Sequence, residues 1–217
     1  MNQKILNQLI LDLGKGEITS QYVKDVFEID VKKSYNNINE WAEAIDDAVL
    51  HRYFSKFWQP DMKKWKHSGL QLVDEVNNLR PRNVLDVGCG YNEFKGKINF
   101  LTGIDPYNDQ ADILIRTLDY KPKEKFDVIL CLGSINFGSQ SKIETEVAHC
   151  ASLLEKGGTM FFRVNPGVKH DKPESKWIDF FAWNVPFIIE LADKLNLKVL
   201  DIRDDTNKRK YFVYRKI

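Results

Sequence analysis

The first 80 residues carry apolar side chains at helical spacing. Apolar positions recur three or four residues apart, and polar residues able to cap a helix precede two of the runs. Pro60 suits the first turn of a further helix, and Pro81 stops helix formation. The pattern predicts four helices, over residues 5–13, 20–27, 38–57 and 61–79. Because no strand signal occurs here, we predict an N-terminal helical cap over residues 1–80.

Short apolar runs after Pro81 have the length and composition of strands. They predict seven strands, over residues 83–87, 100–104, 112–115, 126–132, 159–164, 197–203 and 210–215. Two helices are predicted between the later strands, over residues 141–155 and 180–192. Nearly continuous apolar strands alternating with helices are typical of a mostly parallel sheet with helices on both faces. The turn over 204–208 is too short for a crossover, so the last two strands form an antiparallel hairpin.

The composition is that of a globular protein. Of 217 residues, 43% are apolar, which excludes a disordered chain. The 32 Lys and Arg against 31 Asp and Glu argue against a globally basic nucleic-acid binder, although a local basic patch stays open. No apolar run is long enough to span a membrane. The three cysteines, Cys89, Cys131 and Cys150, form no CxxC pair, so we expect no metal site, no disulfide framework and a reducing cytoplasm.

A glycine turn follows the first predicted strand. Gly88 and Gly90 let the chain turn sharply and let a ligand approach the backbone, at the strand end where open parallel sheets bind ligands. Asp105 ends the second strand, where a carboxylate can accept two hydrogen bonds from a ribose diol. A dinucleotide site needs a third glycine, but Glu93 stands there, and its bulk and charge oppose a diphosphate.

The stretch Val84–Gly90 (VLDVGCG) resembles the first motif of class I S-adenosylmethionine (SAM)-dependent methyltransferases. Phe126–Cys131 is similar to the fourth strand of that family, and Leu153–Gly158 to its turn before the fifth strand. The resemblance implies a Rossmann-like, mostly parallel seven-stranded sheet over residues 81–217 with a C-terminal antiparallel hairpin. One departure is Tyr91–Glu93, where the family often has a glycine; the helix that follows is short, ending near residue 97.

The resemblance also implies a set of cofactor-binding residues. An acid in the first strand, here Asp86, holds the amino-acid end of SAM; Asp105 holds the ribose, and Asp119 meets the adenine amino group. The implied cofactor-binding residues are Asp86, Gly88, Cys89, Gly90, Asn92, Asp105, Pro106, Asp119, Leu132 and Gly133. SAM carries no phosphate, so acids and backbone amides suit it better than a Lys or Arg cradle. The plainer alternatives are local pairing for Asp86 and turn positions for Asp105 and Asp119.

The exit of the fourth strand bears on the methyl acceptor. It lacks the Asn/Asp-Pro-Pro-aromatic motif with which amino-methylating nucleic-acid enzymes of the family hold an extruded base. Ser134 and Asn136 there, with Tyr53 and Trp58 of the cap, are candidate acceptor-binding residues, although the two aromatics also suit packing of the cap. His170 is the candidate general base by residue type and position, and a solvated loop histidine is the alternative.

These observations predict a cytoplasmic SAM-dependent methyltransferase acting on a small-molecule or sugar acceptor. Two alternatives keep the same fold: an enzyme that methylates protein or RNA, and a non-catalytic SAM-binding partner subunit. No DNA-base acceptor, membrane partner or metal is expected, and no oligomeric state follows from the sequence. The cap is expected to cover the site and select the acceptor.

Overall fold

A seven-stranded sheet forms the centre of the computed structural model, which describes residues 2–14 and 16–217. The strands stand in the order β3-β2-β1-β4-β5-β7-β6. They are β1 Val84–Val87, β2 Leu101–Asp105, β3 Ile113–Leu114, β4 Phe126–Leu132, β5 Leu154–Val164, β6 Leu197–Asp205 and β7 Arg209–Lys216. Strands β1 to β5 pair in parallel, whereas β7 is antiparallel to both β5 and β6. The mostly parallel sheet and its C-terminal hairpin are therefore confirmed.

Helices cover the two faces of the sheet unequally. The helices α5 (Gln140–Leu153) and α6 (Val185–Lys194) pack on one face, over alternate strand residues such as Leu85 and Ile129. The opposite face carries the short α4 (Leu72–Asn78), the turns after β1, and Met62 and Leu70 from the segment before α4. This division follows from the strand period of two, which sends neighbouring side chains to opposite faces.

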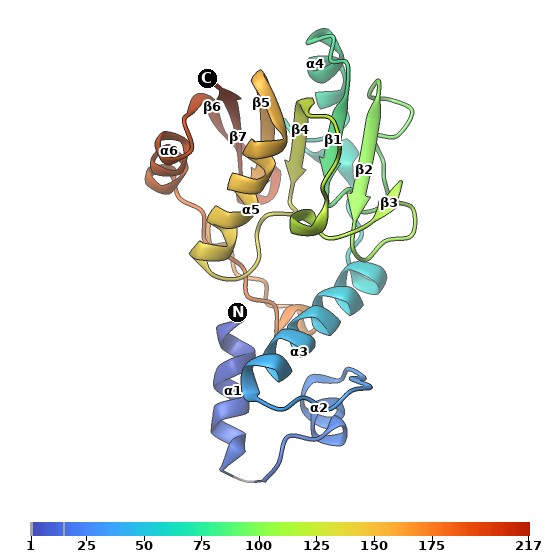
Figure 1. The fold of residues 1–217 in the computed structure, drawn as a ribbon, viewed down its shortest axis with the longest axis vertical. Helices are drawn as coiled ribbons and strands as arrows, with labels where there is room; N and C mark the ends of the chain where they lie inside the picture. Colours follow the sequence, from blue (N-terminus) through green and yellow to red (C-terminus); the bar gives the residue numbers. More distant parts are fainter. Residues whose placement is uncertain (1, 15) are drawn as a thin grey trace.

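Three N-terminal helices form the cap. They are α1 (Gln3–Leu13), α2 (Ser20–Phe27) and α3 (Ile38–Arg52), and a π-helical turn, η1 (Tyr53–Phe57), continues α3. Their N-caps are Asn2, Thr19 and Asn37, each accepting backbone hydrogen bonds through its side chain. In Figure 1 the cap lies below the sheet, on the side towards which the arrows of β2 and β4 point. The three helices are confirmed, while the domain boundary at residue 80 stays a prediction.

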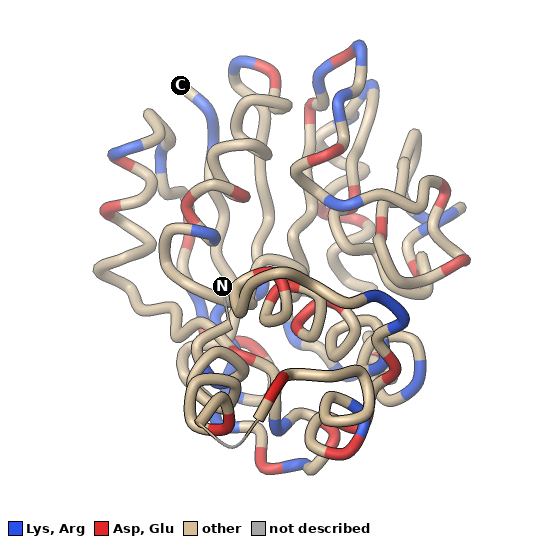
Figure 2. Tube along the Cα trace, turned by 60° about the horizontal axis from the view of Figure 1, so that its bottom comes forward, with Lys and Arg blue, Asp and Glu red and all other residues tan. Residues whose placement is uncertain are grey.

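The cap has its own apolar core. Apolar residues from α1, α2 and α3 pack together, and Ile178 from the loop after β5 joins them. The side-chain amide of Asn2 donates to the carbonyl oxygen of Trp177 at 2.7 Å, and Lys4 Nζ donates to that of Ile178 at 2.7 Å. The start of the chain is therefore fastened to the loop after β5. Acidic and basic residues both occur along the cap (Figure 2).

The helix predicted over 61–79 is wrong in its first half. A short 3-10 turn, η2 (Met62–Lys64), precedes non-helical residues, and α4 begins only at Leu72. Tertiary contacts override the local pattern here, because the His67 amide and the Ser68 hydroxyl both donate to the Asp205 carboxylate at the end of β6. This docking places the 65–71 segment against the β6–β7 corner.

The helix predicted over 180–192 begins later than expected. Asn184 caps α6, so Phe180 and Phe181 are extended. The Phe181 amide donates to the Asn136 carbonyl at 2.8 Å, which holds this segment beside the exit of β4. The two phenylalanines therefore pack through tertiary contacts and not through a helical stripe.

The short helix predicted after β1 is also absent. Residues 91–100, all of them described, form consecutive turns with Asn92, Gly96 and Phe100 at positive φ. Left-handed residues at these intervals interrupt a right-handed helix. Among the described helices, none is both long and apolar enough to cross a membrane.

Candidate functional site

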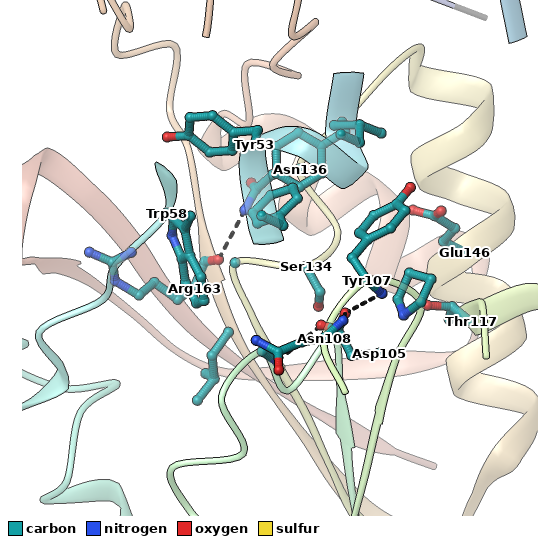
Figure 3. A pocket seen from close by; sticks show the side chains of 18 of the residues that line it. Tyr53, Trp58, Asp105, Tyr107, Asn108, Thr117, Ser134, Asn136, Glu146 and Arg163 are labelled. Atoms are coloured by element: carbon teal, nitrogen blue, oxygen red, sulfur yellow. Dashed lines mark hydrogen bonds between the residues drawn. The ribbon is translucent and has the colours of Figure 1, made fainter. Parts of the chain in front are cut away.

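A cavity of about 380 Å³ lies between the carboxyl ends of the strands and the cap. Its wall includes the turn after β1, the exits of β2, β4 and β5, and side chains from α3, η1 and α5. Figure 3 shows Trp58 and Arg163 on one side, Glu146 and Thr117 on the other, and Ser134 between them. The strand order brings these segments together, since the carboxyl ends of parallel strands share one edge of the sheet.

The glycine turn needs both of its glycines. Gly88 and Gly90 have φ of +65° and +55°, a region that other residues rarely adopt. A Cβ at Gly90 would come within 2.6 Å of the Trp58 ring, and one at Gly88 would overlap Ser134. Both glycines line the cavity, where Ser134 packs against Gly88 and the Trp58 ring against Gly90.

Asp105 fastens the glycine turn to the exit of β2. One carboxylate oxygen accepts from the Gly90 amide at 3.0 Å, and the other accepts from the amides of Tyr107 and Asn108 at 2.7 and 3.0 Å (Figure 3). A carboxylate offers about four acceptor positions, so three are used by the chain itself. Asp105 lines the cavity and has about one acceptor position left for a ligand. Its contact with a ribose stays a prediction.

Asp86 is a buried carboxyl beneath the turn. Only 3% of the residue is exposed, and no described group donates a hydrogen bond to it. Burial, with a smaller contribution from the Asp105 charge, raises the pKa of Asp86 to about 7. Such a group is destabilising unless a partner compensates it. It is not part of the cavity wall itself.

Cys89 and Asn92 lie behind the turn, against β2. A Cβ on Gly103 would stand 2.8 Å from the Cys89 sulfur and 2.6 Å from the Asn92 side-chain oxygen. Burial raises the pKa of the Cys89 thiol, so it is protonated. The structure therefore places both residues outside the cavity wall, where they support the turn from behind.

The other predicted site residues are brought together in the wall. They are Tyr53, Trp58, Pro106, Asp119, Leu132, Gly133, Ser134, Asn136 and His170. The Ser134 hydroxyl is buried and has no hydrogen-bond partner among the described residues. Asn136 has a structural part as well, because its side-chain oxygen accepts from the Asn165 amide at 2.8 Å.

His170 sits in an aromatic and cationic corner. Its ring stacks on Phe180 with centroids 4.0 Å apart, and its Nε2 lies 2.8 Å from Arg209 Nη2. Arginine only donates, so Nε2 is the acceptor and Nδ1 carries the proton. Burial and the Arg209 charge lower the pKa of His170. The His170 ring is therefore neutral, and its Nε2 lone pair already accepts the hydrogen bond from Arg209.

Several residues of the cavity wall were not identified by sequence analysis. Arg163 is the last residue but one of β5. Its Nε lies 3.2 Å from an Asp205 carboxylate oxygen, and its guanidinium carbon lies 4.1 Å from the centre of the Trp65 ring. An arginine inside the apolar run over 159–164 is a signal, because a buried charge needs a partner. Glu146 lies on the apolar side of α5, and burial raises its pKa to about 7. No local signal points to Arg209.

The cavity wall contains both acidic and basic side chains. Of the wall residues, Asp105 lies beside the glycine turn, Asp119 follows β3, and Arg163 and Arg209 lie on β5 and β7. Arg116 and Lys142 also line the wall, beside Asp119 and Glu146 in the sequence. Within residues 2–14 and 16–217, no group of three or more His, Cys, Asp or Glu is arranged to hold a metal ion.

No protein-family model matches this chain, and no curated protein sequence does. Solved structures match it in fold. The 1,6-didemethyltoxoflavin-N1-methyltransferase of Burkholderia thailandensis, bound to 1,6-didemethyltoxoflavin and S-adenosylhomocysteine (SAH), has a TM-score of 0.60 at 15% identity, covering 87% of this chain and 94% of its own.

Two further solved structures match this chain in fold. The SAH-bound magnesium protoporphyrin IX methyltransferase of Synechocystis PCC 6803 has a TM-score of 0.58 at 12% identity, over 79% of this chain and 100% of its own. SAM-bound CalS10, an amino pentose methyltransferase of Micromonospora echinaspora, has a TM-score of 0.53 at 14% identity, over 86% and 100%. The chain therefore has the class I methyltransferase fold, as its resemblance to that family implied.

Proposed function

We propose that this protein is a SAM-dependent methyltransferase acting on a small molecule. The observation that carries the proposal is the position of the buried Asp86 carboxyl beneath the glycine turn, at the carboxyl end of a sheet with the class I fold. A buried carboxyl with no donor is the partner that a cationic amino group requires.

The residues of the turn fit SAM. Asp86, beneath the turn, would compensate the α-amino group, and Gly88 and Gly90 line the cavity with their backbone, packed against Ser134 and Trp58. The one acceptor position left on Asp105 suits a ribose hydroxyl, and Asp119, which is exposed at the cavity wall, is our candidate for the adenine amino group. Ser134 adds a buried hydroxyl without a partner. No phosphate cradle is needed, because SAM carries none.

When bound, SAM would supply a methyl group on a cationic sulfur, which an acceptor atom can displace in line. The chain's part is to align the acceptor and keep water out. The cap lies over the strand ends, and Trp58 lies against Gly90, so residues from both regions line the cavity. For acceptors that must lose a proton, His170 is the proposed base, once its Nε2 is released from Arg209.

The size and cover of the cavity support a small acceptor. A space of about 380 Å³ under a helical cap has the dimensions of a small-molecule site. Among the structures of the same fold, one is described with bound 1,6-didemethyltoxoflavin and another as an amino pentose methyltransferase. These are properties of those proteins and support the same class of acceptor here.

Calorimetry with SAM and SAH tests the proposal first. Both should bind, and no detectable binding of either would contradict the proposed function. Transfer of a labelled methyl group into fractionated extract then separates the acceptor classes. Label in the small-molecule fraction is expected; label in protein or RNA would overturn the acceptor class, and binding without any transfer would indicate a non-catalytic subunit.

A further inference from the structure

Arg209 brings an unpaired positive charge into the cavity wall. It begins β7, and its Nη2 donates to Nε2 of His170 at 2.8 Å. Its Nη1 is buried, and no described group accepts a hydrogen bond from it. None of the ion pairs among the described residues includes Arg209. Burial lowers the pKa of this guanidinium, as expected for a charge without a counter-ion.

The neighbours of Arg209 do not neutralise it. Arg163 on β5 is also cationic, but Asp205 lies 3.2 Å away and offsets that charge. His170 is neutral, since burial and Arg209 lower its pKa, and Tyr53 is neutral, since burial raises its pKa. Arg209 therefore has no carboxylate partner among the described residues. An unsatisfied guanidinium facing a cavity is costly unless a ligand supplies the missing acceptor.

Flat aromatic side chains line much of the cavity. They are Tyr53, Phe54, Trp58, Trp65, Tyr107, Phe137 and Phe180. Phe180 stacks on His170 beside Arg209, and Phe54 meets Phe137 edge to face at 5.3 Å. Surfaces of this kind favour a planar apolar body, which leaves Arg209 to bind a polar group at its edge.

Resting on the proposed function, we propose that the methyl acceptor is a flat apolar molecule carrying one carboxylate, and that Arg209 binds this carboxylate. A guanidinium presents two parallel N–H groups to a carboxylate, and Nη1 is free for that purpose. One guanidinium without a counter-ion suits one carboxylate. A phosphate dianion would bring two charges, and Arg163 nearby is already paired with Asp205.

The experiment measures charge preference without catalysis. Matched acids and amides, namely benzoate with benzamide, phenylacetate with phenylacetamide and 2-naphthoate with 2-naphthamide, are titrated into the SAH-saturated protein by calorimetry. At least one acid should bind about tenfold or more tightly than its amide, the usual size of a charge-assisted hydrogen bond. If no acid is preferred over its amide, the inference is wrong. Phenyl phosphate binding more tightly than every acid would also overturn it.

Variants assign the preference to Arg209. Arg209→Gln should remove the preference for the acid, and Arg209→Lys should restore part of it. Arg203→Gln is the matched control, because Arg203 on β6 is exposed and pairs with Asp201 at 2.6 Å outside the cavity. The melting temperature of Arg209→Gln should hold or rise, since a buried charge without a counter-ion is removed. A preference that persists in Arg209→Gln contradicts the proposal.

SAH affinity separates this inference from the proposed function. It should be unchanged in Arg209→Gln. If it falls as much as acid binding does, Arg209 serves the carboxylate of the cofactor and the inference fails while the proposed function stands. If the wild-type protein does not bind SAH, the proposed function itself fails.

Discussion

The two sides of the cavity are built in different ways. The side of the glycine turn comes from neighbouring segments, Gly88 to Asn108, joined by backbone amides that donate to the Asp105 carboxylate. The opposite side assembles Tyr53, Arg163, His170 and Arg209 from separate parts of the chain. The first side, acidic through Asp105 and the buried Asp86 beneath it, is set by local geometry. The second, aromatic and basic, is set by topology. The proposed cofactor site can therefore be inferred from a short motif, whereas the proposed acceptor site cannot.

Asp205→Ala should have the largest effect, because the basic side depends on this one carboxylate. It accepts from Ser68, the His67 amide and Arg163, and its side chain is fully buried. Removing it leaves a buried arginine unpaired, at a cost of about 3–5 kcal/mol in the free energy of unfolding. Denaturant titration measures this. Asp204→Ala, which breaks only an exposed pair with Lys210, should change it by less than about 1 kcal/mol.

Asp86→Asn tests the acidic side. SAH affinity should fall about 100-fold, because the variant removes the charge that would compensate a buried amino group. The melting temperature should hold or rise, since the carboxyl has no donor among the described residues to lose. Asp119→Asn, at an exposed position, should lower SAH affinity only a few-fold. Unchanged SAH affinity in Asp86→Asn would refute the assignment.

The pH dependence of SAH binding should follow Asp86. The pKa of this carboxyl is about 7 in the empty protein, and pairing with an ammonium requires the ionised form. Affinity should therefore fall about tenfold between about pH 8 and about pH 6, with a proton released on binding near pH 7. Calorimetry in buffers of different ionisation enthalpy detects that proton. In Asp86→Asn, the release should disappear.

Stability of the empty protein should change with pH in the opposite sense. Burial raises the pKa of Asp86 and Glu146 above their ordinary values, so the folded state binds more protons than the unfolded chain between about pH 4 and about pH 7. The contribution of these two carboxyls to stability is therefore greatest in acid and is lost as the pH rises to about 7. A smaller loss in Asp86→Asn checks this.

The smallest effects are expected from alanine substitutions at two glycines. Gly90 and Gly96 both have positive φ, but only a Cβ at Gly90 would meet another residue, the Trp58 ring. Gly96→Ala should cost about 1 kcal/mol in unfolding free energy through backbone strain and leave SAH affinity unchanged. Gly90→Ala should cost at least as much and also weaken SAH binding several-fold. Equal SAH affinities would show that the turn tolerates a side chain.

The fold followed from the sequence where local and tertiary preferences agree. The strands β1, β2 and β4, the hairpin β6–β7 and the helices α1 to α3 lie where the apolar pattern predicted them. The helix expected over 61–79 failed because His67 and Ser68 bind Asp205, far along the chain. The helix expected after β1 failed because Asn92 and Gly96 take positive φ.

The candidate site shows the same difference between residues that have a local sequence signature and residues that tertiary contacts put in place. Gly88, Gly90 and Asp105 were found because a turn and a strand end have local signatures, and all three line the cavity. Arg163 and Glu146 left a usable signal, a charged residue within an apolar pattern. No local sequence signal points to Arg209, because its place in the cavity depends on the insertion of β7 between β5 and β6.

The position of β7 also fixes an order of events during synthesis. Residues 209–216 form the strand between β5 and β6, so the edge of β5 has no partner until this segment has left the ribosome. An unpaired apolar edge is open to association with other chains. The glycine turn can form long before then, whereas Arg209 arrives with β7. The residues of the proposed cofactor side are therefore synthesised well before those of the proposed acceptor side are complete.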